Sequence, residues 1–202
     1  MNELDHEKEF ELAWNDPSNT RYELPPIDIN AVLEERYEPD EPLIFTRTLL
    51  WDLEVRKARR PDVFIPNVVA EGSADSWGGD EVFVRRSDQR LWLAPEERGL
   101  ILEQTSFDHA RQTVTFIGAA ELPGPGGENL VATTKQPIFH VEHGVAGEEP
   151  RPLNTWRIVH LTDAPDPRVT AVFDGIAANP WLPLYVEIYI RDVLGIGLTR
   201  RE

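Results

Sequence analysis

The feature that most constrains the fold is a change of hydrophobic period late in the chain. Between residues 81 and 162 apolar and polar residues mostly alternate, and turn-forming residues separate the segments. Such alternation is typical of half-buried strands, and short connections between strands favour antiparallel pairing. From residue 168 the period becomes 3.6, which is typical of a helix with one buried face. The sequence therefore predicts an α+β fold, with an antiparallel sheet followed by a mostly helical segment, residues 168–194.

The individual elements follow from the same patterns. Asp28 is a suitable N-cap for a helix at 29–37, and Pro61 ends another at 51–60. Pro137 interrupts a late strand, which favours an edge position or a bulge. A first helix is expected at 3–14. The expected strands are 43–50, 81–86, 89–93, 100–106, 112–120, 130–134 continued by 138–143, and 154–162.

Composition restricts the class of protein. The 202 residues suit one domain with an attached arm, and the 41% apolar fraction is enough for a sizeable core. Cysteine is absent, which excludes disulfides, thiolate metal sites and cysteine nucleophiles. The first residues do not have the pattern of a signal peptide, and no stretch approaches the roughly 20 apolar residues of a membrane span. We therefore expect a cytoplasmic protein.

Charge is large and unevenly placed. The net charge of −16 disfavours binding to nucleic acids or anionic membranes. Residues 1–42 contain 13 acidic and three basic residues. This segment is expected to be an acidic N-terminal arm, attached to a main domain at 43–202. Leu4, Phe10 and Trp14 predict that the arm packs on its own domain or across a homodimer.

The order of the expected elements resembles the SRPBCC superfamily, the START or Bet v 1-like helix-grip fold. The resemblance covers roughly residues 43–195 and rests on the order and spacing of elements, without a sequence motif. It implies a curved antiparallel sheet wrapped around a C-terminal helix, with a ligand cavity between them. Polyketide aromatase/cyclases, carriers of hydrophobic ligands and lipid-transfer proteins belong to this superfamily, so the resemblance implies a cavity and no particular chemistry.

Histidines on the late strands are the candidate acid and base groups. His160 shares the more apolar face of its strand with Trp156 and Ile158, so we expect it to point toward the cavity. His140 and Glu142 share one face of the preceding segment, and His143 lies on the other. If these strands pair, His140 or His143 lies within reach of His160. Such a pair suits removal of a proton next to a carbonyl group, because the pKa of histidine lies near neutrality.

Other interpretations of these residues stay open. The histidines are also compatible with structural roles, and His140, Glu142 and His160 are compatible with an open metal site. Tyr185 and Tyr189 lie four residues apart on the expected last helix, so they share a face that either lines the cavity or belongs to the core. The residues expected to bind a ligand are Trp92, Phe116, Glu142, Trp156 and Tyr185.

The basic run Arg56-Lys57-Ala58-Arg59-Arg60 is expected to compensate the acidic arm. An alternative is that it docks an acidic partner, such as an acyl carrier protein. Phosphate-binding loops, dinucleotide fingerprints, nucleophile elbows and the His-Glu-x-x-His zinc motif do not occur, so no cofactor is expected.

The functional hypothesis follows from these features. It is a cofactor-free cyclase, dehydratase or isomerase that acts on a hydrophobic, polyketide-like molecule. His160 is the expected general acid/base, and His140 and Tyr189 assist it. A non-catalytic carrier of a hydrophobic ligand is the main alternative, and a metal-dependent enzyme on a small barrel is a further one. Titratable groups that converge on an apolar cavity favour catalysis, whereas an entirely apolar lining favours a carrier.

Overall fold

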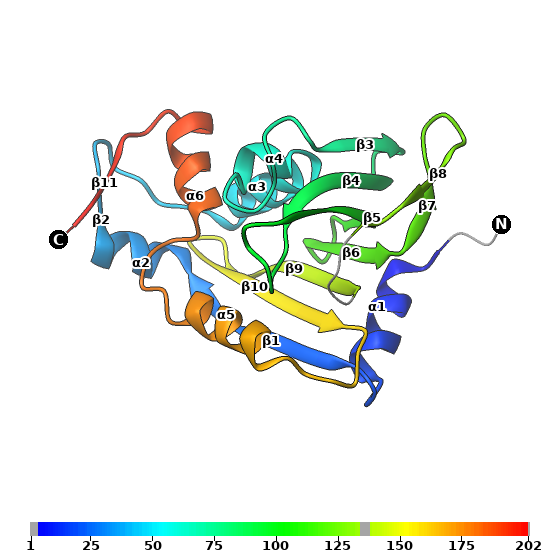
Figure 1. Ribbon diagram of the computed structural model, residues 1–202. Coiled ribbons are helices and arrows are strands. Elements are labelled where there is room, and N and C mark those ends of the chain that lie inside the picture. The colour runs from blue at the N-terminus through cyan, green and yellow to red at the C-terminus, as the bar shows by residue number, and fades with distance from the viewer. Residues whose placement is uncertain (1–3, 134–137, 202) are drawn as a thin grey trace.

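A computed structural model describes residues 4–133 and 138–201 of the chain. Its centre is a seven-stranded antiparallel sheet in the order β1-β10-β9-β6-β5-β4-β3 (Figure 1). Two small sheets pair β2 with β11 and β7 with β8. The strands are β1 (Thr20–Asp28), β2 (Tyr37–Pro39), β3 (Asp75–Gly78), β4 (Val82–Arg90), β5 (Arg98–Asp108), β6 (Thr113–Ala119), β7 (Glu121–Pro123), β8 (Asn129–Val131), β9 (Phe139–Glu148), β10 (Arg151–His160) and β11 (Leu198–Arg200). The α+β fold with an antiparallel sheet is confirmed.

Helices lie on both faces of this sheet and beside it. The helices are α1 (His6–Asn15), α2 (Ile29–Arg36), α3 (Arg47–Arg59), α4 (Pro61–Phe64), α5 (Pro167–Ala177) and α6 (Leu184–Ile188), which continues into a π-helical turn, η1 (Tyr189–Val193). Figure 1 shows α1 at one end of the molecule and α2 with β2 and β11 at the other. The helical nature of residues 168–194 is confirmed, with an interruption around Pro180 and Pro183. None of the described helices is long and apolar enough to span a membrane.

The two faces of the sheet have different covers. One face, here called the cavity face, carries Phe116, Val141, Trp156 and Ile158 and is covered by α3, α5 and α6. Alternate residues point to the opposite face, which carries Ile117 and Val159. Phe10 of α1 packs on these two residues and is fully buried. The arm therefore packs on its own domain. We call this second face the α1 face.

The segment 20–39 is built into the fold. β1 is an edge strand of the main sheet, paired with β10, and its register shifts between Leu24 and Ile27, where Pro25 and Pro26 lie. Proline lacks a backbone donor, so an edge with a bulge is where a strand accommodates it. The helix expected at 29–37 is confirmed as α2. Asp28 caps it, as expected, because its side chain accepts from the Ala31 amide at 3.0 Å.

Three parts of the expected strand pattern differ from the structure. Residues 43–50 contain the start of α3, where the Thr46 hydroxyl accepts from the Leu49 amide at 3.1 Å. Short apolar runs do not distinguish a buried strand from a buried helix, which explains this error. The hairpin expected across Ser87-Asp88 is instead one continuous strand, β4, in which Ser87 is fully buried.

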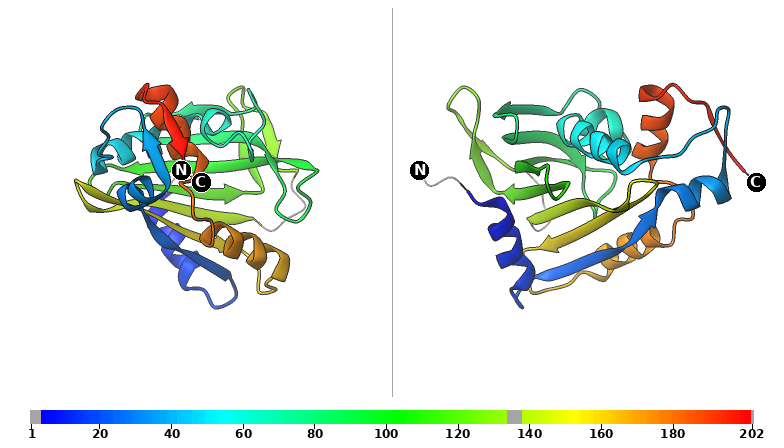
Figure 2. Two further views of the ribbon diagram at one scale, coloured as in Figure 1. Left: turned by 90° about the vertical axis from the view of Figure 1, so that its left-hand side faces the viewer. Right: turned by 180° about the vertical axis from the view of Figure 1, so that it is seen from behind.

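The late strand was also misassigned. Residues 129–131 form β8, which pairs with β7 outside the main sheet, and β9 begins separately at Phe139. Pro137, expected at the interruption, lies outside the described residues. The other strands and the antiparallel pairing of β9 with β10 agree with the sequence analysis. Figure 2 shows that the strands change direction gradually from β4 to β1, as in a twisted sheet.

Candidate functional site

A cavity of about 200 Å³ lies between the cavity face and helices α3, α5 and α6. Its walls are mainly apolar and include Trp92, Phe116, Phe139 and Trp156. Trp92, Phe116, Trp156 and Tyr185, all expected to bind a ligand, line it. Six polar or titratable side chains also line it: Lys57, Arg85, Gln89, Glu103, His143 and Tyr185.

Lys57 and Glu54 form a buried ion pair beside this cavity. Both lie on the inward side of α3, and the Lys57 Nζ atom is 2.7 Å from the Glu54 carboxylate. Burial would raise the pKa of Glu54, but the positive charge of Lys57, together with His143, outweighs it and holds the pKa at about 2. Burial lowers the pKa of Lys57 against the pull of Glu54. The pair therefore places an ammonium group in an apolar site.

The Glu54 carboxylate also orients the imidazole ring of His143. Its Nδ1 atom lies 3.2 Å from Glu54 Oε2, and its ring stacks on Trp156 with 5.1 Å between centroids. Burial and the nearby charge of Lys57 lower the pKa of His143 to about 4, so the imidazole is neutral at neutral pH. A neutral histidine held by a carboxylate has one nitrogen left for a ligand.

Asn154 links this carboxylate to two aromatic side chains. Its Nδ2 donates to Glu54 Oε1 at 3.0 Å, and its Oδ1 accepts from the Trp156 indole at 3.2 Å and from the Tyr185 hydroxyl. The Lys57 Nζ atom lies 3.9 Å from the centre of the Tyr185 ring, within range of a cation–π interaction. We call Glu54, Lys57, His143, Asn154 and Tyr185 the Glu54 cluster.

A second buried ion pair lines the cavity. The Arg85 Nε atom donates to Glu103 at 2.9 Å, its Nη1 donates to the Ala58 carbonyl oxygen at 2.9 Å, and its guanidinium lies 4.5 Å from the centre of the Phe116 ring. None of the four charged residues of these two pairs was predicted as a site residue from the sequence: Glu54, Lys57, Arg85 and Glu103.

His160 occupies the apolar end of the cavity face. It lies beside Trp156 and Ile158 on β10, as expected, but it is enclosed by the rings of Tyr22, Phe139 and Phe173. Its Nε2 atom is buried without a hydrogen-bond partner in the described structure, and burial lowers its pKa to about 4. Phe139 and Phe173 line the cavity, whereas His160 lines a separate hollow of about 100 Å³ beyond them.

His140 and Glu142 lie on the α1 face, away from the cavity. The expectation that His140 shares a site with His160 is wrong geometrically, because His160 pairs with Phe139 and so faces the other way. His140 Nδ1 accepts from the Gly118 amide at 3.1 Å, and Glu142 accepts from Arg157 at 2.8 Å. The metal set His140, Glu142 and His160 is divided between two faces. In the described ranges, 4–133 and 138–201, no group of three histidine or carboxylate side chains fits a metal ion.

Tyr189 and the basic run have local partners. The Tyr189 hydroxyl donates to Asp52 of α3 at 2.7 Å. Tyr189 does not line the cavity. Arg56 pairs with Asp52 and Arg60 pairs with Asp62, while Arg59 donates to carbonyl groups of residues 79 and 80. Among the described residues of one chain, this run therefore does not pair with the acidic arm, and compensation of the arm of a neighbouring chain stays a prediction. Glu7 and Glu11 of α1 instead pair with Arg111 and Arg157.

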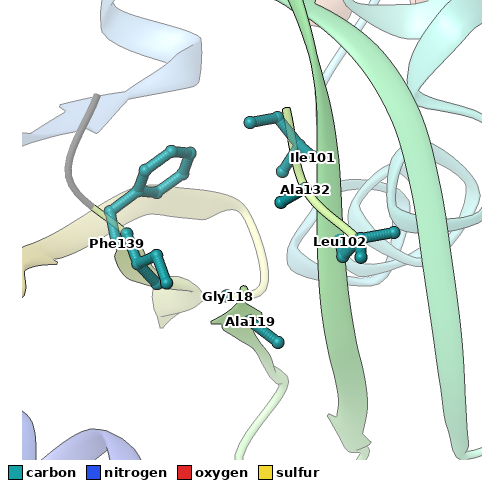
Figure 3. A pocket seen from close by; sticks show the side chains of 7 residues that line it. Ile101, Leu102, Gly118, Ala119, Ala132 and Phe139 are labelled. Atoms are coloured by element: carbon teal, nitrogen blue, oxygen red, sulfur yellow. The ribbon is translucent and has the colours of Figure 1, made fainter. Parts of the chain in front are cut away.

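A smaller hollow between β5, β6 and residue 132 carries no polar side chain. Figure 3 shows Ile101, Leu102, Ala119, Ala132 and Phe139 around it. Its volume of about 10 Å³ is the size of one water molecule. The 200 Å³ cavity is the candidate ligand site because it combines mainly apolar walls with buried polar side chains.

Comparison with known proteins shows which fold encloses this cavity. No protein-family model and no curated protein sequence matches the chain. Among solved structures, the chain is similar to the Zhui aromatase/cyclase of Streptomyces sp. R1128, with a TM-score of 0.54 and 12% identity over 86% of this chain and 95% of that chain.

Two further solved structures have the same architecture. Ara h 8.0201 has a TM-score of 0.51 at 10% identity over 84% of this chain and 97% of that chain. The major latex-like protein 151 of Panax ginseng has a TM-score of 0.50 at 13% identity over 80% and 94%. The resemblance to the Bet v 1-like helix-grip fold is thereby confirmed.

Proposed function

Since the chain has the helix-grip fold, we propose that it is an enzyme that binds a hydrophobic, polyketide-like carbonyl compound in the 200 Å³ cavity and catalyses its cyclisation and dehydration. One observation carries the proposal. Lys57, His143 and the Arg85–Glu103 pair converge on a cavity whose other walls are chiefly apolar. Buried titratable groups with shifted pKa values in a cavity are typical of catalytic sites.

Each polar group has a role in such a reaction. The neutral His143 removes a proton from a carbon atom between two carbonyl groups, and the Lys57 ammonium holds the enolate oxygen that forms. The carbon then attacks the carbon of a third carbonyl group further along the same molecule, a carbon–carbon bond forms, and the new alkoxide takes the proton back from His143. Loss of this hydroxyl with a neighbouring hydrogen as water completes the dehydration.

A non-catalytic carrier is the second candidate, because the cavity is lined mostly by apolar side chains. The two candidates differ in turnover and not in binding. Catalysis by His160 stays a prediction, since its ring lies at the apolar end of the cavity face. Delivery of the substrate by an acyl carrier protein also stays a prediction, for which Arg56 and Arg60 are the exposed cations. Formation of a homodimer stays a prediction too.

The test uses a synthetic β-triketone thioester and chromatography with mass spectrometry to detect the cyclised product. We expect turnover by the wild-type protein and a loss of about 10²- to 10⁴-fold in the His143→Phe variant, the usual effect of a lost general base. His140→Phe is the matched control, because His140 lies on the α1 face. Binding of the thioester without any product contradicts the enzyme and supports the carrier. Full turnover by a folded His143→Phe protein excludes His143 as the base.

A further inference from the structure

We infer that the cavity recognises a ligand hydroxyl group together with a carbonyl group of the same molecule, as in the enol of a β-dicarbonyl compound or in an acylphenol. The hydroxyl donates to His143 Nε2, and the carbonyl oxygen accepts from Lys57. This inference rests on the proposed function only in requiring that a carbonyl compound occupies the cavity. It follows from where the protons of the Glu54 cluster lie.

The first step locates the proton of His143. Glu54 is ionised and can only accept hydrogen bonds, so His143 must carry its proton on Nδ1, the atom 3.2 Å from Glu54 Oε2. A neutral imidazole protonated on Nδ1 has a lone pair on Nε2. His143 lines the cavity, and its side chain keeps 16% of its exposure. It therefore offers a ligand an acceptor and no donor.

The second step locates the proton of Tyr185. Asn154 donates from Nδ2 to Glu54, and this contact fixes which end of its amide is the oxygen. That oxygen accepts both the Trp156 indole N–H and the Tyr185 hydroxyl. The single phenolic proton is thus committed to Asn154. The Tyr185 hydroxyl therefore does not donate to a ligand, although the side chain lines the cavity.

The third step identifies the donor. A lysine ammonium has three N–H groups and no lone pair, and Lys57 lines the cavity. Lys57 Nζ and His143 Nδ1 both contact Glu54 Oε2, at 2.7 Å and 3.2 Å. One carboxylate oxygen therefore brings the donor side chain and the acceptor side chain together. A simple ketone supplies only acceptors and leaves His143 Nε2 unpaired, and sites built to bind a hydroxyl discriminate strongly against analogues without it.

The remaining walls determine the body of the ligand. From His143 to Phe139, β9 runs four residues, or about 13 Å, and Val141 lies between them on the same face. Trp156 and Phe116, on the two strands that flank β9, add flat apolar rings, and Ile158 adds an aliphatic side chain. A planar bicyclic body with its oxygen atoms at the Lys57 end matches this shape and polarity.

The test compares the binding of matched probes by isothermal titration calorimetry. The first probe is a naphthol with an acetyl group meta to the hydroxyl, a position from which the two groups cannot form an intramolecular hydrogen bond. The second probe is the O-methyl ether of this naphthol. We expect the wild-type protein to bind the naphthol at least about tenfold more tightly. We expect His143→Phe, which retains a ring to stack on Trp156, to lose this preference. Tyr185→Phe should keep it.

Equal affinity of the wild-type protein for both probes overturns the inference and leaves the proposed function intact, because a carbonyl ligand is still bound. Failure of both probes to bind overturns both proposals. A preference lost in Tyr185→Phe but kept in His143→Phe assigns the acceptor to Tyr185 and overturns the inference. Nitrogen-15 NMR spectra of the wild-type protein show which ring nitrogen of His143 carries the proton, and this measurement does not depend on the folding of a variant. Protonation of His143 on Nδ1 is expected, and protonation on Nε2 contradicts the inference.

Discussion

Glu54 and Lys57 are charged residues at positions that α3 buries. Together with Leu50, Leu53 and Ala58 they follow the i, i+3, i+4, i+7, i+8 spacing of a single buried helix face. Had residues 47–59 been predicted as one helix, this spacing would have identified both charges as candidates for a site. From the sequence, this segment was predicted as a strand and a helix, and Lys57 was assigned to a basic run. The signal was present and depended on correct assignment of the element.

The buried pair predicts a large effect from removing one partner. Lys57→Met leaves the Glu54 carboxylate buried, with His143 and Asn154 as its remaining partners among the described residues. We expect a loss of about 3–5 kcal/mol in the free energy of unfolding, measured by urea denaturation. The double variant Glu54→Gln/Lys57→Met removes both charges and should recover a large part of that loss. Additive or larger destabilisation in the double variant would contradict a compensated pair.

His160 predicts a pH dependence of stability. Burial lowers its pKa from 6.5 to about 4, so between these pH values the unfolded chain binds a proton that the folded chain does not. Stability should therefore fall as the pH falls from about 6.5 to about 4, by roughly 3 kcal/mol from this residue. His160→Phe removes that contribution and fits the aromatic surroundings of Tyr22, Phe139 and Phe173.

Urea titrations at pH 7 and at pH 4.5 measure this difference. We expect the His160→Phe variant to lose less stability between the two pH values than the wild-type protein, with little change at pH 7, because the buried Nε2 atom has no partner to lose among the described residues. An unchanged pH dependence would show that the His160 ring reaches solvent when it protonates.

At the scale of elements, the order of the late strands was predictable and the start of the domain was not. The period-2 pattern in residues 100–120 and 154–162 predicted β5, β6 and β10, although both faces of these strands carry buried side chains. β1 was missed because Pro25-Pro26 and the acidic residues Glu23 and Asp28 are unfavourable in strands, and because the outward side chains of this edge strand face water. β4 was divided because Ser87-Asp88 has the composition of a turn, while the sheet buries Ser87.

The helix α1 covers the α1 face and predicts a contrast between two of its apolar side chains. Phe10 is fully buried against Ile117 and Val159, whereas Leu12 is 60% exposed. We expect Phe10→Ala to lower the free energy of unfolding by about 3–5 kcal/mol and Leu12→Ala to change it by less than about 0.5 kcal/mol. Chemical denaturation measures both. Similar small effects would show that α1 is dispensable for stability.

At the scale of the whole molecule, the change of period near residue 168 carried most of the fold. A run of antiparallel strands followed by an amphipathic helical segment has few compact arrangements, and packing of that segment on one sheet face is the one found. The cavity followed from this arrangement. The sequence did not predict which histidine faces the cavity. Alternation in a strand separates its two faces, but it does not tell which face the helices cover.

The cavity is a property of the assembled molecule, because its lining comes from helices α3, α5 and α6 and from strands β4, β5, β6, β9 and β10. A ligand that binds only the folded state stabilises it by RT ln(1 + [L]/Kd), about 2.7 kcal/mol at a concentration of 100 Kd. The naphthol probe should therefore raise the melting temperature by several degrees. Val141→Trp, at the centre of the cavity floor, should fill the space and abolish the rise, while Val131→Trp on the exposed β8 should leave it unchanged. A rise that persists in a folded Val141→Trp protein would place the bound probe outside this cavity.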